Sequence, residues 1–406
     1  MPSERKISSK IIETLLNDQS FHIEFNGFLS NHSKHAVIAL HHLGVSPEMV
    51  KEYYDAHAEH TPYGYGLEPP RPSNNTITQN NWKVYFGKHR NFTSYCNFFD
   101  QKEKELGMKR MLEEYVPTLL PGCVGSLMHG TIHLGWALDS GNRWMIIEGI
   151  SYMAFSYVSS NIEKTFPASH TPVEDNSVLD SLLRIADEWD TDGATLCHWL
   201  ETTLTDDKYS ASAGFHPELA VTGAQFNIAK VLREGHPFIH TTPSWIKNLN
   251  LDTIWQQLHE AATLLYMTNP GDFITLHLIT SLHAIEQITN QLPVDQQKLA
   301  VKCYWTAALG VLFSLGEFPT RTKLETLHLK YKDADDIGEG QEWEQIIARA
   351  ITEKEEHNPK LVYVQRLMWE RFGHRSIFRI AASHFTTTPE VTRLGSGVDL
   401  SADLPE

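Results

Sequence analysis

Histidine is the residue of this sequence best suited to chemistry near neutral pH, and the chain has 22 histidines. A neutral imidazole can accept a proton, and it also binds transition metals. His129 and His133 are one helical turn apart, and Trp136 follows on the same stripe. Roughly one such pair is expected by chance. Three roles therefore stay open for the pair: packed core or pocket side chains, catalytic or substrate-binding groups, or metal ligands.

Other histidine pairs are less well placed for a common role. His277 and His283 lie six residues apart on one expected helix, about 120° apart around its axis, so they do not point into one pocket. We favour His277 as the functional one, with a core role equally open. His32 and His35 lie near a helix start, where capping and pocket roles are both open. His236 and His240 are also four residues apart, but Pro237, directly after His236, favours a loop there.

The signatures of common cofactor sites are missing from the sequence. There is no G-x-G-x-x-G, no P-loop, no G-x-S-x-G and no H-E-x-x-H, so no nucleotide or flavin site of the usual form is expected. A metal at His129 and His133 would need a third ligand close by in the sequence, and none is present there. We therefore expect no metal and no tightly bound cofactor.

The composition is that of a soluble globular protein. It is 41% hydrophobic and 21% charged, and 34 basic against 50 acidic residues give a net charge of −16. That excess of acid argues against nucleic-acid and anionic-membrane partners. The four cysteines are widely spaced without a C-x-x-C, so we expect reduced and mostly buried thiols.

One uncharged segment is long enough to span a bilayer, residues 116–138. Pro117 and Pro121 should interrupt a helix there, and the two histidines are unsuited to hydrocarbon. We predict a buried loop followed by a core helix. The first residues lack the apolar stretch of a secretory signal, so a cytoplasmic location is expected.

Helical spacing of apolar residues recurs between proline and glycine breaks, which predicts an all-α fold in a single large multi-helical domain. In residues 36–57, Gly44 ends one helix, and Ser46 with Pro47 begins the next as N-cap and first residue. A similar start at Asp272 opens another helix. Long irregular segments separate the helices: residues 61–81, which suit a lid or pocket wall, 166–176, 205–214, 332–341 and the residues after 386.

Five stretches in order resemble the questin oxidase-like family of flavin-independent Baeyer–Villiger oxidases. They are residues 31–54, residues 82–107, residues 115–138 with HGTIH, residues 273–285, and HNPKL at residues 357–361. The resemblance covers roughly residues 20–385, between an N-terminal segment (1–19) and a C-terminal tail (386–406).

The resemblance implies an oxidoreductase that uses O₂ to insert oxygen beside a ring carbonyl and open a polycyclic aromatic, typically an anthraquinone-like ketone or its hydroquinone. NADPH is associated with the family as reductant, although the reducing equivalents can instead reside in the hydroquinone. A small aromatic substrate is thus the expected partner, and a homodimer is left open.

Within that resemblance, a neutral histidine is the natural base for a phenol or hydroquinone. We assign this role to His129 or His277, with His133 also catalytic. Substrate-binding residues would be His35, Tyr54, Trp82 and Trp136, the two tryptophans forming aromatic walls.

Two other functions remain open on the sequence alone. A histidine-rich helical fold could hold haem or a pair of metal ions and act as a metal-dependent oxidase. An apolar cleft between the expected helices could also belong to a non-catalytic protein that binds an aromatic or lipid-like metabolite.

Overall fold

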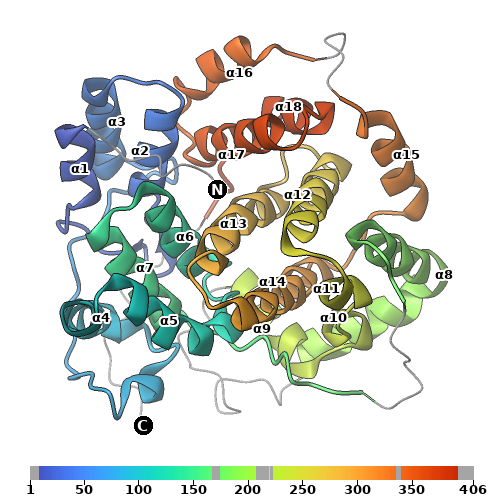
Figure 1. Cartoon of the computed structure of the whole chain (residues 1–406), viewed down its shortest axis with the longest axis horizontal. Helices are drawn as coiled ribbons and strands as arrows, with labels where there is room; N and C mark the ends of the chain where they lie inside the picture. Colours follow the sequence, from blue (N-terminus) through green and yellow to red (C-terminus); the bar gives the residue numbers. More distant parts are fainter. Residues whose placement is uncertain (1–8, 167–173, 207–218, 220–222, 335–339, 392–406) are drawn as a thin grey trace.

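Helices make up nearly all of the regular structure, in a computed structural model that describes residues 9–166, 174–206, 219, 223–334 and 340–391 (Figure 1). The α-helices are α1 (Lys10–Leu16), α2 (Ser33–His42), α3 (Pro47–Glu59), α4 (Phe92–Leu106), α5 (Met108–Leu119), α6 (His129–Ser140), α7 (Arg143–Phe155), α8 (Val178–Thr205), α9 (Ala224–Glu234), α10 (Pro237–His240), α11 (Ser244–Asn248), α12 (Leu251–Thr268), α13 (Phe273–Thr289), α14 (Val294–Ser314), α15 (Arg321–Tyr331), α16 (Trp343–Ala350), α17 (His357–Arg371) and α18 (Ser376–Ser383). The 3-10 helices are η1 (Trp82–Tyr85), η2 (His89–Asn91) and η3 (Leu120–Gly122). Two short antiparallel strands, β1 (Glu24–Phe25) and β2 (Leu29–Ser30), complete the described elements. The predicted all-α class is confirmed.

Local capping signals set several helix ends where the sequence predicted them. The Ser46 hydroxyl accepts a hydrogen bond from the Met49 amide at 3.3 Å, and Gly44 has the left-handed φ of +89° that ends α2. Asp272 caps α13 by accepting from the Thr275 amide at 2.7 Å. The predicted pair of helices over residues 36–57 is therefore confirmed.

Three prolines lie within helices, and for Pro117 and Pro237 this differs from the sequence prediction. Pro117 lies inside α5 rather than interrupting it, because a buried apolar face holds that helix in place. Pro359 lies in the first turn of α17, where backbone N–H groups have no partner within the helix. Residues 237–240, predicted as loop, form the single turn α10, because Pro237 has the backbone angle of a first helical residue and His236 is its N-cap.

The predicted buried loop and core helix within residues 116–138 are confirmed, since α6 begins at His129 after an irregular buried stretch. Helix α6 packs closely on α7 and α13 because glycines stand at the crossings. A Cβ on Gly135 would lie 2.3 Å from the Ala284 backbone of α13, and one on Gly149 of α7 would lie 2.4 Å from Leu134. This close packing fixes the position of α6 relative to both neighbours.

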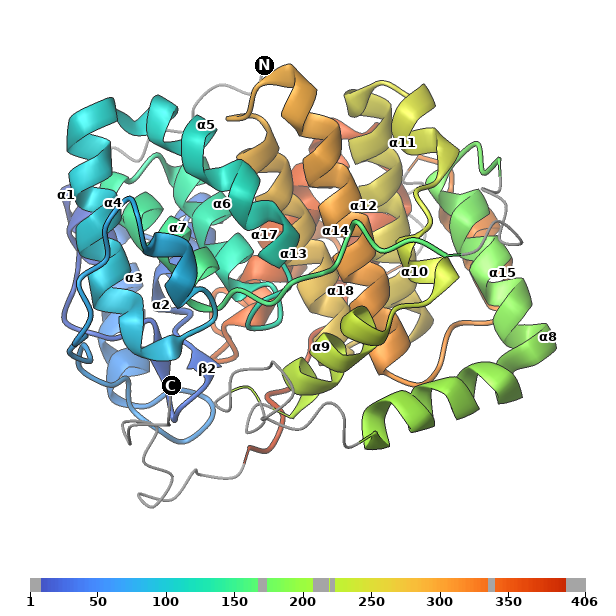
Figure 2. The ribbon, with the colours of Figure 1, turned by 90° about the horizontal axis from the view of Figure 1, so that it is seen from below.

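Four helices that are far apart in the sequence meet near the middle of the molecule: α2, α6, α13 and α17 (Figures 1 and 2). Around them, buried apolar side chains from Ile12 to Ala382 form one connected core. None of the described helices combines the length and apolar composition needed to cross a bilayer.

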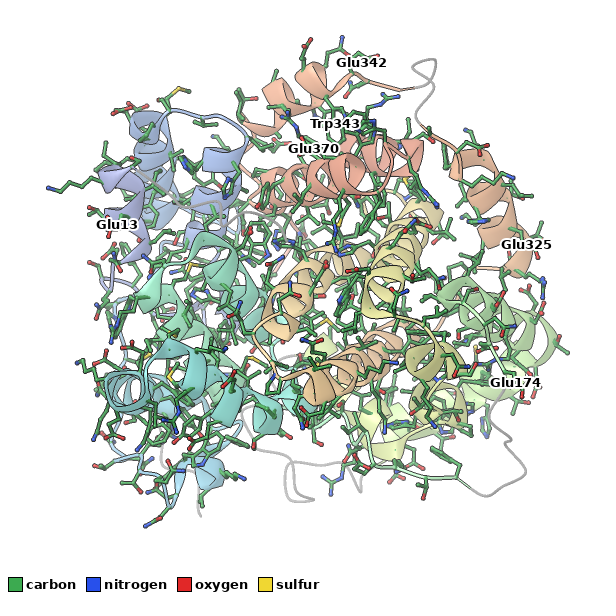
Figure 3. All side chains as sticks on the ribbon, viewed as in Figure 1. Glu13, Glu174, Glu325, Glu342, Trp343 and Glu370 are labelled. Atoms are coloured by element: carbon green, nitrogen blue, oxygen red, sulfur yellow. The ribbon has the colours of Figure 1, made fainter. Side chains whose placement is uncertain are left out.

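Acidic side chains lie at the rim of the molecule, as Glu13, Glu325 and Glu342 do in Figure 3. As predicted, the four cysteines are free thiols and mostly buried: Cys96, Cys123 and Cys303 are buried, and Cys197 is exposed.

Candidate active site

Four buried histidines meet where α2, α6, α13 and α17 come together. They are His32 before α2, His129 at the start of α6, His277 in α13 and His357 at the start of α17. One ring nitrogen from each lies within 4.8 Å of those of the other three. We call these residues the four-histidine cluster.

A strained turn places His129 in the cluster. Ser126, Leu127 and Met128 all have positive φ, between 48° and 65°, a conformation that residues other than glycine rarely adopt. The turn brings the Ser126 carbonyl to the Nδ1 of His129, which donates a hydrogen bond to it. The Ser126 hydroxyl in turn donates to the buried carboxylate of Glu24 at 3.0 Å. The strain is thus stored beside the cluster, as is typical of functional sites.

Two further cluster histidines are held in the same way. The Nδ1 of His277 donates to the Phe273 carbonyl at 2.7 Å, and the Nδ1 of His357 donates to the Glu355 carboxylate. A neutral ring that donates through Nδ1 keeps a lone pair on Nε2. The Nε2 atoms of His129, His277 and His357 are buried without a hydrogen-bond partner among the described residues.

The fourth histidine, His32, has a different environment. Its Nδ1 lies 2.9 Å from the Lys360 Nζ and 3.2 Å from the Nδ1 of His35. Lys360 is completely buried, and this burial lowers its pKa to about 7, against the opposing effect of Glu356 and Glu355. As a neutral amine Lys360 could accept a hydrogen bond from the Nδ1–H of His32, and as an ammonium it would donate to that nitrogen.

Burial keeps the cluster neutral at physiological pH. It lowers the pKa of all four histidines, that of His277 to about 3, and the neighbouring Lys360 lowers it further. Neutral imidazole is the form that binds metal ions.

The cluster fits a transition-metal ion. Imidazole nitrogen suits zinc, copper, iron and nickel. Ligating histidines ordinarily donate their other N–H to a carbonyl or carboxylate, which is what the Nδ1 atoms of His129, His277 and His357 do here. The expectation of no metal rested on the lack of a third ligand near His129 and His133. The fold brings together further side chains, from distant helices, that could act as ligands.

The structure brings together several of the predicted site residues. His129 and His277 are both in the cluster, with their rings 4.9 Å apart, whereas His283 points away and pairs with Asp139 at 3.3 Å. His35 and His133 lie next to the cluster and contact each other, with 3.0 Å between the His35 Nε2 and the His133 Nδ1.

The predicted aromatic and tyrosine residues are more scattered. Trp136 packs on His35, with ring centres 5.9 Å apart. Tyr54 donates to Asp18 at 2.8 Å. Trp82 packs among Phe98 and other aromatic residues of α4 and α5, contacts that give no support to its expected role as a wall of the site.

Sequence reasoning missed His357 and Lys360 as site residues, and left His32 between two roles. The H-x-x-K-L element did contain His357 and Lys360, so the spacing was a usable signal. His32 is in the pocket rather than acting as a cap, because its side chain makes no capping hydrogen bond.

Comparisons with known proteins agree with the sequence resemblance. Over 149 residues the chain is 29% identical to "Baeyer-Villiger oxidase AgnL3" of Paecilomyces divaricatus, covering 34% of this chain and 31% of that protein. Over 170 residues it is 25% identical to "Baeyer-Villiger oxidase notM" of Aspergillus sp. (strain MF297-2), covering 40% of this chain and 36% of that protein. The matches thus span about a third of the length of these relatives.

A family model matches far more of the chain. It describes the questin oxidase-like family and covers residues 29–365, which contain all four histidines of the cluster. The chain belongs to the questin oxidase-like family.

Proposed function

We propose that this chain is a metal-dependent oxygenase that carries out a Baeyer–Villiger-type oxidation at the four-histidine cluster. The observation that carries the proposal is the set of three buried Nε2 atoms without partners among the described residues, on His129, His277 and His357, in a cluster whose four histidines each bring one ring nitrogen within 4.8 Å of the others. An unpaired polar atom is costly to bury. Three such atoms in one place are explained by a ligand that they share.

The four imidazoles would hold the ion through ring nitrogen. When bound, a redox-active ion supplies the one-electron chemistry with O₂ that imidazole lacks. The surrounding residues fix the rings: the carbonyls of Ser126 and Phe273 and the Glu355 carboxylate each accept from an Nδ1–H and so keep the Nε2 lone pair turned inward.

Family membership and the aromatic ring of Phe273 beside the cluster support the proposed substrate class. The Phe273 ring lies 4.8 Å from that of His277 and 4.7 Å from that of His357, measured between ring centres. A flat polycyclic ketone or its hydroquinone suits such an aromatic wall. The names of the two relatives support Baeyer–Villiger oxidation.

The oxidation balances without an added cofactor when the substrate is a hydroquinone. One atom of O₂ enters the ring beside the carbonyl carbon, and the other leaves as water with the two electrons and two protons that the hydroquinone gives up. With the quinone as substrate, NADPH would have to supply those electrons. His129 and His277 each have only Nε2 left for chemistry, so in the absence of metal the same atoms would be the general bases.

Oxygen uptake by chelator-treated protein tests the proposal. The protein is given a reduced hydroxyanthraquinone with or without NADPH, before and after addition of Fe²⁺, Cu²⁺, Mn²⁺ or Zn²⁺, and the product is analysed by mass. We expect uptake and a gain of one oxygen atom only after addition of a redox-active ion. Full turnover by the chelated protein would contradict metal dependence and favour the histidine-base mechanism.

A matched pair of variants tests whether the reaction takes place at the cluster. His277→Ala should lose both stoichiometric metal binding and turnover. His283→Ala alters a histidine of the same helix that is equally buried but pairs with Asp139, and it should keep both. Equal metal content and activity in the two variants would contradict the proposed site.

A further inference from the structure

A line of hydrogen bonds runs from the cluster into the protein interior. The Nδ1 atoms of His32 and His35 are 3.2 Å apart, the Nε2 of His35 is 3.0 Å from the Nδ1 of His133, and the Nε2 of His133 is 3.4 Å from the Oε2 of Glu148. All four side chains are buried. We call this set the imidazole chain.

The direction of these hydrogen bonds is set at the carboxylate end. Glu148 receives the Lys34 ammonium at 2.8 and 2.6 Å and the Trp144 indole N–H at 3.0 Å. Burial alone would raise the pKa of Glu148, but Lys34 and His133 bring it below its ordinary value, so the group is an ionised acceptor. The Nε2 of His133 must therefore be the donor to it.

The donor role of His133 then determines which nitrogen donates and which accepts in the other two rings. The rings of His133, His35 and His32 are all buried, which disfavours the charged form, so each ring is neutral and carries one N–H. With Nε2 protonated, the Nδ1 of His133 accepts from the Nε2–H of His35. The Nδ1 of His35 then accepts from the Nδ1–H of His32, which leaves the lone pair of His32 on Nε2.

The reverse direction is unfavourable. It would turn a bare Nε2 of His133 toward the Glu148 carboxylate, leaving two acceptors facing each other in a buried site. Lys360 is the group that could enforce it, because as an ammonium it would donate to the Nδ1 of His32. Glu148, through His133 and His35, therefore favours a proton on the Nδ1 of His32, whereas an ammonium on Lys360 would favour a bare Nδ1.

We infer that Glu148 is a positioning residue that sets the tautomer of His32 through His133 and His35. The result is that His32 carries its proton on Nδ1, as His129, His277 and His357 do, and all four rings have the tautomer in which Nε2 is free to bind. The consequence for metal affinity rests on the proposed function, but the tautomer itself is a property of the metal-free protein.

Replacement of Glu148 by glutamine should reverse the donor and acceptor roles along the imidazole chain. The amide oxygen would stay with Lys34, and the amide N–H would donate to the Nε2 of His133. The opposite tautomer would then pass along to His32 and put a proton on its Nε2. Glu286→Gln is the matched control, because Glu286 is also buried between a histidine and a cation, with His259 at 2.9 Å and Arg371 at 2.6 Å.

The measurement is NMR of metal-free protein labelled with ¹⁵N-histidine, in which protonated and unprotonated ring nitrogens differ widely in chemical shift. The His32 signals are assigned by their loss in His32→Gln. We expect a protonated Nδ1 on His32 in the wild type and in Glu286→Gln, and a protonated Nε2 in Glu148→Gln. Retention of the wild-type tautomer in folded Glu148→Gln would overturn the inference.

A second variant covers the case in which Glu148→Gln does not fold. His133→Phe cuts the chain but leaves the ion pair of Lys34 and Glu148 in place, so His32 should lose its single tautomer. Retention of a single His32 tautomer in His133→Phe would also overturn the inference.

Titration of each protein with Co²⁺ separates this inference from the proposed function. Affinity should fall about 10- to 100-fold in Glu148→Gln and stay unchanged in Glu286→Gln. A reversed tautomer with unchanged Co²⁺ affinity would overturn the link to metal binding. A reversed tautomer in a protein that binds no metal, even as wild type, would contradict the proposed function and leave the role of Glu148 standing.

Discussion

Single side chains around the four-histidine cluster decide which ring nitrogen faces inward. His129 shows this most clearly, because its Nδ1 is held by a carbonyl that a left-handed turn brings into place. The turn is anchored in turn by Glu24, which accepts from Ser126 and Tyr152 at 3.0 Å each and contacts the Nδ1 of His89 at 3.1 Å. The Glu24 carboxylate, which lies outside the cluster, therefore stabilises the strained turn that orients His129 inside it.

Replacement of Glu24 by glutamine tests this anchoring. The amide keeps one acceptor but turns an N–H toward groups that already donate, so we expect a loss of ~1–3 kcal/mol in the free energy of unfolding. We also expect weaker Co²⁺ binding at the cluster. Urea unfolding and metal titration measure the two effects. Unchanged values for both would show that Ser126 holds its conformation without Glu24.

At the scale of helices, the sequence predicted what local signals determine. Ser46 and Asp272 cap their helices through contacts within three residues, and the 120° separation of His277 and His283 follows from helix geometry alone. The meeting of His32 with three distant histidines could not be predicted in this way. It depends on packing between helices whose histidines are 80 to 325 residues apart in the sequence.

The same limit explains the roles of His129 and His133. Their spacing placed them on one helix, and the structure gives them different neighbours: His129 contacts the cluster, and His133 contacts His35 and Glu148. Pro117 shows the opposite error, in which a local rule was overridden by burial of the apolar face of α5. Tertiary contacts decided both cases.

Packing at Gly135 of α6 is expected to control the geometry of the cluster. A Cβ at Gly135 would collide with the Ala284 backbone, so Gly135→Ala should push α6 from α13 and separate His129 from His277. Overpacking of this kind costs ~1–3 kcal/mol. We expect lower stability together with reduced turnover, measured by urea unfolding and oxygen uptake.

Gly193→Ala is the control for that substitution. Gly193 lies in α8 with no atom within 4 Å of the added Cβ, and alanine favours helix by up to about 1 kcal/mol. Stability should stay equal or rise, with turnover unchanged. A Gly135→Ala protein that matched Gly193→Ala in both measurements would contradict the account of α6 packing.

For the whole molecule, the many buried histidines predict sensitivity to acid. Burial lowers the pKa of His22 and His57 to about 4, against an ordinary value of 6.5. Such a ring stays neutral in the folded protein and takes up a proton on unfolding. The stability from this source is complete above about pH 6.5 and falls as the pH is lowered toward 4. The carboxyl groups of Glu355 and Glu356, whose pKa burial raises, act in the opposite direction.

His57→Phe isolates one such contribution, because all other groups cancel when the variant is compared with the wild type. The Nε2 of His57 is buried without a hydrogen-bond partner among the described residues, and its ring stacks on Tyr53, so phenylalanine can replace it. We expect similar free energies of unfolding at pH 7.5. At pH 5 the variant should be more stable by about 2 kcal/mol, since one proton contributes 1.36 kcal/mol per pH unit below 6.5. Urea unfolding of metal-free protein at both pH values measures this difference. A difference that does not grow on acidification would mean that His57 is protonated in the folded state.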